Sequence, residues 1–137
     1  MHKFIILITL LVTNLSLAQN VLVTGSNRGI GYEFVSQYAE RGWNVIATSR
    51  SPHDDVELIN LAEKYSNITI EKLDVTSQED IDNLVDKLSG QSIDLLINNA
   101  GLLGDRKKQQ WGNIDKSTFD QLMDVNVFGP LKISEAF

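Results

Sequence analysis

The feature that most constrains the fold of this chain is a regular alternation of short apolar runs with amphipathic helical patterns. The apolar runs are rich in β-branched residues and predict buried strands at 21–24, 43–49, 68–73 and 93–97. A helical pattern follows each of them. The first pattern ends at Arg41 and the second covers 56–64. The third begins at a cap at Ser77, and the fourth runs from a cap at Ser117 towards Phe137. Four such repeats predict an α/β fold, a doubly wound parallel sheet with helices on both faces.

Composition narrows the possible functions. The chain has 137 residues, a formal net charge of −6 and no cysteine. This length predicts about one domain. An acidic chain without a basic stripe argues against nucleic acid as a partner. The absence of cysteine excludes disulfides, thiolate metal sites and cysteine nucleophiles, and we predict no metal site.

The first 18 residues resemble a signal peptide. Lys3 precedes an apolar run over 4–12, and small residues at Ser16 and Ala18 suit cleavage before Gln19. The run is shorter than the about 20 residues of a membrane span, so no stable span is expected once the leader is removed. An additional N-terminal strand or helix, or a start codon placed too early, are the alternatives. A genuine leader predicts a secreted or extracytoplasmic protein, and its absence a cytoplasmic one.

A glycine-rich loop joins the first predicted strand to the first helix. We expect Gly25 to allow a tight turn, Gly29 to let a pyrophosphate approach the backbone, and Gly31 to let the helix pack closely on the sheet. The helix N-terminus offers free N–H groups to phosphates. The loop therefore predicts a dinucleotide site, with a plain tight turn as the alternative. Its candidate cofactor-binding residues are Thr24, Gly25, Ser26, Asn27, Arg28, Gly29, Ile30 and Gly31.

The end of the second strand bears on the choice of cofactor. Sites that select NAD usually have an acidic residue there, which binds the ribose 2′-hydroxyl. This chain has Ser49 and Arg50 instead, and the glycine loop adds Arg28. Two guanidinium groups suit a 2′-phosphate, and the sequence suggests no carboxylate to repel it. We therefore predict NADP(H) in preference to NAD(H). The alternative is that both arginines are solvated surface charges.

The loop reads Thr-Gly-x-x-x-Gly-Ile-Gly and resembles the nucleotide loop of the short-chain dehydrogenase/reductase family, which has a Rossmann-type fold. Three further motifs match in the same order: Leu73-Asp74-Val75, Asn98-Asn99-Ala100-Gly101 and Val125-Asn126-Val127. The resemblance covers residues 20–137 and is strongest to carbonyl-reductase and C-factor-like members. It implies an adenine contact at Asp74 and an active-site role for Asn126. Taken singly, these residues are also ordinary for turns and loops. The resemblance adds the candidate cofactor contacts Asp74, Val75, Asn98, Ala100 and Gly101 to Arg50 and the glycine loop.

The last helix combines a polar residue with a proline. Helical spacing places Asn126 on one face with Phe119 and Leu122, so a buried amide is expected there. Pro130 has no N–H to donate to the carbonyl of Asn126, which predicts a kink at the proline. In the family the backbone of this Asn is thought to hold a water in a proton relay. A proline kink that serves only packing is the alternative.

The catalytic Ser and the Tyr-x-x-x-Lys motif of the family are absent from the chain. Its tyrosines, Tyr32, Tyr38 and Tyr65, lack a lysine four residues later. We therefore expect residues 19–137 to be an NADP-binding Rossmann domain that is incomplete at its C-terminus, after the fourth strand and following helix.

Three functions remain open at this point. The first is an oxidoreductase fragment that acts on a small carbonyl or alcohol substrate. The second is a non-catalytic nucleotide-binding or interaction module of the same ancestry. The third is a sugar-nucleotide epimerase, although those relatives usually have Gly-x-x-Gly-x-x-Gly. The last helix forms a dimer face in many relatives, which leaves a homo-oligomer open.

Overall fold

A four-stranded parallel sheet forms the centre of the molecule. The computed structural model describes residues 19–137. Strands β1 (Asn20–Val23), β2 (Asn44–Ser49), β3 (Ile68–Lys72) and β4 (Leu95–Ile97) lie in the order β3-β2-β1-β4. Val21 of β1 pairs with Val45 on one side and Leu95 on the other. The predicted parallel α/β sheet is thus confirmed, with β1 and β2 at its centre.

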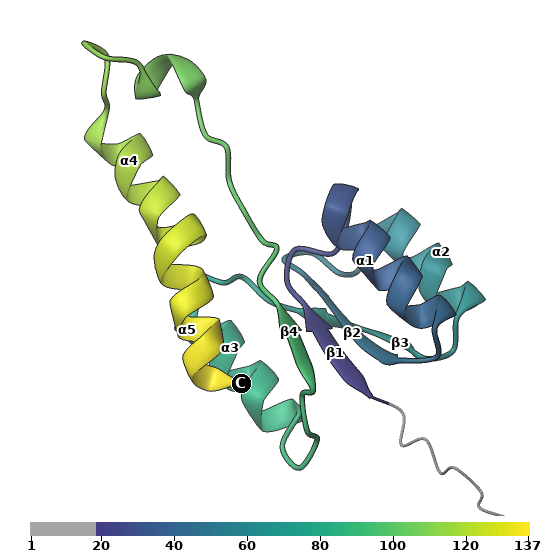
Figure 1. Cartoon of the computed structure of the whole chain (residues 1–137). Helices are drawn as coiled ribbons and strands as arrows, with labels where there is room; N and C mark the ends of the chain where they lie inside the picture. The colour runs from purple at the N-terminus through teal and green to yellow at the C-terminus, as the bar shows by residue number, and fades with distance from the viewer. Residues whose placement is uncertain (1–18) are drawn as a thin grey trace, which may run out of the picture.

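Helices cover both faces of this sheet. Helices α1 (Gly29–Glu40) and α2 (Val56–Lys64) lie on one face, and α3 (Gln78–Lys87) and α5 (Gly129–Ala136) on the other (Figure 1). Two buried clusters result because neighbouring strand residues point to opposite faces. Val21 and Val23 of β1 pack with α1 and α2, whereas Leu22 packs with α3 and α5.

The boundaries of the elements differ slightly from the predicted ones. Strand β1 begins and ends one residue earlier than predicted, and β4 lacks the first two predicted residues. The polar segment 105–112 contains a short 3₁₀ helix, η1 (Arg106–Gln109), which Asp105 caps. Ser77 caps α3 as predicted, its Oγ accepting from Asp80 N at 3.2 Å. Within residues 19–137, no helix is both long and apolar enough to cross a membrane.

The predicted last helix is divided into three parts. Helix α4 (Lys116–Met123) leads into a π-helical segment, η2 (Asp124–Phe128), and then into α5. The N-cap is Asp115, whose carboxylate accepts from Thr118 N at 2.9 Å, so the prediction of a cap at Ser117 was wrong. Both residues are good caps by type, and Asp115 takes the cap position because the helix begins at Lys116.

The irregularity in this helix precedes the proline instead of lying at it. The N–H of Gly129 donates to the carbonyl of Asp124, five residues back. Pro130 itself lies in the first turn of α5, where a missing N–H is tolerated. The predicted kink at Pro130 is therefore corrected to a π-helical turn over the five residues before Gly129. A wider turn moves the backbone away from the proline ring.

Candidate functional site

A cleft of about 790 Å³ lies at the carboxyl ends of the strands, where parallel α/β sheets bind ligands. Its volume is in the range of about 300–1,000 Å³ that is usual for cofactor sites. The turns after β1 to β4 all contribute to it, together with η2. Of the predicted site residues, those that line the cleft are Gly25, Asn27, Arg28, Gly29, Ile30, Arg50, Asp74, Val75, Ala100 and Gly101.

Three glycines shape the wall that β1 and α1 contribute. Gly25 and Gly29 have φ values of 65° and 60°, which side-chain-bearing residues rarely adopt. A Cβ at Gly31 would lie 2.3 Å from the carbonyl oxygen of Gly25 and 2.4 Å from Asn99 Nδ2. A Cβ at Gly29 would meet nothing within 4 Å. The loop is thus tight where it meets the sheet and open where it faces the cleft.

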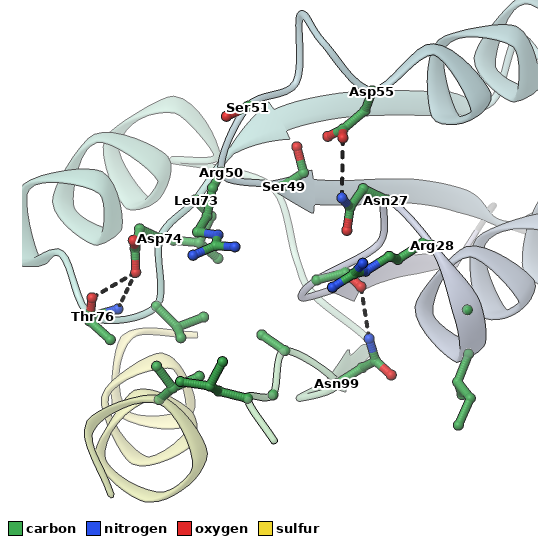
Figure 2. A pocket seen from close by; sticks show the side chains of 18 of the residues that line it. Asn27, Arg28, Ser49, Arg50, Ser51, Asp55, Leu73, Asp74, Thr76 and Asn99 are labelled. Atoms are coloured by element: carbon green, nitrogen blue, oxygen red, sulfur yellow. Dashed lines mark hydrogen bonds between the residues drawn. The ribbon is translucent and has the colours of Figure 1, made fainter. Parts of the chain in front are cut away.

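Three polar side chains, those of Thr24, Ser26 and Asn99, hold this loop in place. Thr24 Oγ1 accepts from the N–H groups of Asn99 and Ala100, at 2.9 and 3.0 Å. Asn99 Nδ2 donates to the carbonyl of Thr24 at 3.0 Å and to that of Gly25 at 2.8 Å. The bond drawn to Asn99 in Figure 2 is the second of these. Ser26 Oγ donates to Val23 O at 2.8 Å and accepts from the N–H of Thr48. Thr24 and Ser26 therefore lie behind the wall of the cleft and shape it.

Asn99 was not among the predicted site residues. Its side chain ties the turn after β4 to the glycine loop, because it reaches both Thr24 and Gly25. The sequence motif includes Asn99, but the contacts of Asn99 join positions about 75 residues apart. Only the pairing of β1 with β4 brings them together.

Asp74 lies on the opposite wall, after β3. Its Oδ1 accepts from the N–H and the hydroxyl of Thr76, at 2.9 and 2.7 Å (Figure 2). Its own N–H donates to Asp80 Oδ2 at 2.9 Å, so the first turn of α3 supports this wall. The hydrogen bond from Lys72 Nζ, helped by that of the Asp74 N–H, holds the pKa of Asp80 below its usual 3.8 against the opposing effect of burial.

The end of the cleft next to β2 contains three charged side chains. Arg28 and Arg50 are exposed, line the cleft and take part in no salt bridge with another residue of 19–137. Asp55, at the N-terminus of α2, lines the same cleft, and its Oδ1 accepts from Asn27 Nδ2 at 3.1 Å (Figure 2). The expectation that no carboxylate would lie here was wrong. The turn that joins β2 to α2 brings Asp55 back beside the glycine loop.

Asn98 and Asn126 lie outside the lining of the cleft. Asn98 Nδ2 donates to Ser134 Oγ at 3.0 Å and so connects β4 to α5. The amide of Asn126 accepts from the N–H of Leu102 and donates to its carbonyl, both at 2.8 Å. Asn126 is exposed and not buried as predicted, and Phe119 on the same face is 55% exposed. The hydrogen-bond partner of Asn126 is nevertheless part of the cleft wall, since Leu102 lines the cleft.

The arrangement suits an elongated anionic ligand. Phosphates can meet the open side of the glycine loop and the N-terminus of α1, where no side chain of the described residues caps the first turn. The cationic side chains of Arg28 and Arg50 line the cleft, together with the acceptor carboxylate of Asp74. Within residues 19–137 no cluster of His, Asp and Glu could hold a metal ion, and the chain has no cysteine.

Known proteins share both the sequence pattern and this fold. The (+)-neomenthol dehydrogenase of Arabidopsis thaliana is 30% identical over 138 residues, which is 85% of this chain and 47% of that protein. A Burkholderia multivorans structure described as a short-chain dehydrogenase/reductase with bound NADP has a TM-score of 0.80 and 33% identity. That match covers 87% of this chain and 52% of the other. A carbonyl reductase from Pseudomonas aeruginosa PAO1 in complex with NADP has a TM-score of 0.80 and 30% identity, covering 86% and 54% of the two chains.

The chain spans about half the length of the curated relatives it matches. The sequence profile described as short chain dehydrogenase matches residues 19–137. The region matched contains every strand of the sheet and every residue that lines the cleft. The chain therefore belongs to the short-chain dehydrogenase family.

Proposed function

We propose that this chain binds NADP(H) in the cleft and forms the cofactor-binding part of an oxidoreductase that acts on a small carbonyl or alcohol. The single observation that carries the proposal is the glycine loop. Its backbone is open toward the cleft at Gly29, and its close packing at Gly31 leaves no room for a side chain. The matched structures described with NADP support the choice of cofactor.

The residues present fit the adenosine and pyrophosphate parts of such a dinucleotide. The pyrophosphate would lie against the glycine loop and the N-terminus of α1. Arg28 and Arg50 would hold the 2′-phosphate, since guanidinium groups bind phosphate in a bidentate way. Asp74 has one carboxylate oxygen outside its bonds to Thr76, so it can accept from the amino group of the adenine. Val75 would contribute an apolar contact to the base.

NADP(H), when bound, would supply the hydride that passes to or from the substrate carbon. The chain's own residues bind and orient it. Asn99 and Thr24 fix the loop that meets the phosphates. Asn126 fixes Leu102 on the cleft wall through two hydrogen bonds. We assign to the Asn126 backbone the water-holding role of its counterpart in the family, because Pro130 has no N–H for its carbonyl.

Titration of NADPH and NADH into the full chain tests this proposal. We expect tighter binding of NADPH, and a loss of about tenfold or more in NADPH affinity for Arg28→Ala, because a charged hydrogen bond contributes about 1.5–3 kcal/mol. NADH affinity should change much less. Arg41→Ala is the matched control, since Arg41 is exposed at the other end of α1. Equal affinity for the two cofactors, or no binding of either, would refute the proposal.

A non-catalytic nucleotide-binding module of the same ancestry is the second candidate, since the residues that line the cleft supply contacts for a nucleotide. Purified full chain that binds NADPH but reduces no carbonyl compound agrees with both candidates. Turnover by the chain alone would instead show that another residue supplies the proton. A reading frame that continues into a Tyr-x-x-x-Lys motif would favour the oxidoreductase. Homo-oligomer formation stays a prediction for the same protein.

A further inference from the structure

A segment between β4 and α4 presents an almost fully exposed tryptophan. We call residues 103–115 the tip segment. Trp111 is 95% exposed, and Leu103 and Ile114, near the two ends of the segment, are 64% and 60% exposed. Tryptophan is on average one of the more deeply buried residue types, so the exposure of Trp111 is unusual. Three exposed apolar side chains on one short segment indicate a surface that contacts a partner.

Hydrogen bonds hold the tip segment in a closed loop. Gln109 Nε2 donates to the carbonyl of Leu103 at 2.8 Å, and the N–H of Asp115 donates to the carbonyl of Lys108 at 3.1 Å. Trp111 lies between Lys108 and Asp115 in the sequence. Figure 1 shows this part of the chain, from η1 to the start of α4, beyond the N-terminal end of α4 and away from the sheet. The backbone therefore presents Trp111 on an ordered projection.

The charge of this projection differs from that of the chain. The formal net charge of the chain is −6, whereas η1 carries three consecutive exposed cations, Arg106, Lys107 and Lys108. The two acids of the tip segment, Asp105 and Asp115, cap η1 and α4. Lys108 Nζ lies 4.0 Å from Asp115 Oδ2, but Arg106 and Lys107 take part in no salt bridge within residues 19–137. Two unpaired cations beside an exposed tryptophan indicate a negatively charged partner.

An anionic bilayer fits these features better than an acidic protein. Tryptophan is enriched at the surface of bilayers, where its ring lies at the level of the head groups, and anionic lipids attract neighbouring lysine and arginine side chains. An acidic protein would need a pocket shaped for Trp111, whereas a bilayer accepts a projecting side chain without one. The acidic sheet and helices lie away from the tip segment (Figure 1), and salt screens charges farther than about 8–10 Å from the surface.

We propose that the tip segment docks on the surface of an anionic bilayer. Trp111 enters the head-group region, and Arg106 and Lys107 contact the lipid phosphates. Leu102 directly precedes the tip segment and lines the cleft, so docking holds the chain at the bilayer through a segment that continues from the cleft wall. This inference goes beyond the proposed function and does not depend on it, because no residue of the tip segment lines the cleft.

Tryptophan fluorescence of the full chain tests the proposal at the residue itself. The chain has two tryptophans, so Trp43→Phe leaves Trp111 as the only one. We expect its emission to shift to shorter wavelength with vesicles of phosphatidylcholine and phosphatidylserine, and brominated acyl chains in those vesicles to quench it. Vesicles of phosphatidylcholine alone should have a much smaller effect. Unchanged emission with the anionic vesicles would overturn the inference. A shift with polyglutamate but not with vesicles would also overturn it, in favour of an acidic protein.

Sedimentation of the full chain with the same vesicles gives a second measurement that does not require Trp43→Phe. Trp111→Ser should bind the anionic vesicles about tenfold or more weakly than the unaltered chain, because it loses a large apolar side chain. Val56→Ser is the matched control, since Val56 is an apolar side chain of α2 that is 65% exposed. The predicted leader is present in all variants, so it does not contribute to the difference. Equal binding by the two variants would overturn the inference.

A pair of double variants tests the role of charge. Arg106→Gln with Lys107→Gln should weaken binding to the anionic vesicles about tenfold or more. Arg41→Gln with Lys64→Gln removes the same charge from exposed positions at the ends of α1 and α2 and should have little effect. An equal loss in both would overturn the inference. None of the substituted residues lines the cleft, so NADPH affinity, which tests the proposed function separately, should be unchanged.

Discussion

Among single residues, Asp80 connects the stability of the molecule most directly to the shape of the cleft. It is 7% exposed and accepts hydrogen bonds from Lys72 Nζ and from the N–H of Asp74, at 2.8 and 2.9 Å. The first bond chiefly lowers the pKa of its carboxyl group, and burial opposes it. A carboxylate whose pKa is lower in the folded than in the unfolded chain stabilises the fold above the unfolded value. That contribution is lost as the pH falls through the folded pKa.

Asp80→Asn is expected to lower the free energy of unfolding at pH 7 by about 1–3 kcal/mol, because the pairing with Lys72 and the support of Asp74 are weakened. The difference between the variant and the unaltered chain should begin to shrink as the pH falls below about 4, where the carboxyl group of the unfolded chain takes up a proton. It should shrink further as the pH falls through the lower pKa of Asp80 in the folded chain. Urea unfolding of the variant and of the unaltered chain, at pH 7 and at pH 3, measures the loss in the free energy of unfolding and its decrease at low pH. Asp82→Asn, at an exposed position on the same helix, is the control. A difference that is unchanged at pH 3 would contradict the explanation.

At the level of elements, the segment from α4 to α5 shows how neighbouring elements change the position of a helix irregularity that the local sequence predicts. A Cβ at Gly129 would lie 2.8 Å from Val75 Cγ2, so α5 approaches the turn after β3 closely at this point. The chain also has to bring Asn126 to Leu102, which it bonds twice. A π-helical turn between α4 and α5 satisfies both constraints, and Pro130 removes the N–H that would favour a regular α-helical turn.

Pro130→Ala is expected to convert part of the π-helical segment to regular α-helix, because the new amide at position 130 can donate to the carbonyl of Asn126. Hydrogen exchange measured by NMR should show that amide to be protected. Leu131→Ala, at an exposed position of α5, is the control for changed side-chain packing and should leave the segment as it is. Rapid exchange of the new amide would show that contacts with Val75 and Leu102 alone impose the π turn.

For the whole molecule, the sheet and its two buried clusters are built from residues 20–137. The predicted signal peptide lies outside the described residues, and its removal before Gln19 stays a prediction. A chain that begins at Gln19 should have the same free energy of unfolding and the same NADPH affinity as the full chain, because it retains both clusters and the cleft. Denaturant unfolding and calorimetric titration measure the two quantities. A loss of stability would mean that the first 18 residues belong to the fold.

The sequence by itself determined the order and type of the elements and the position of the cleft. Apolar runs and helical periodicity depend on local side-chain patterns, so β2 and α2 could be predicted within a residue of their bounds. The three glycines of the loop could be predicted in the same way. Their backbone conformation and close packing exclude other residue types, so the requirement for glycine at these positions can be recognised in the amino-acid sequence.

Only the tertiary structure decided which side chains meet. Asn99 reaches the glycine loop because β4 pairs with β1, and Asp55 reaches the same loop because α2 packs beside α1 on one face of the sheet. Neither contact has a local signal, since each joins residues far apart in the chain. The placement of Asn126 at the surface was missed for the same reason. Helical spacing shows which residues share a face, but the neighbouring elements decide whether that face is covered.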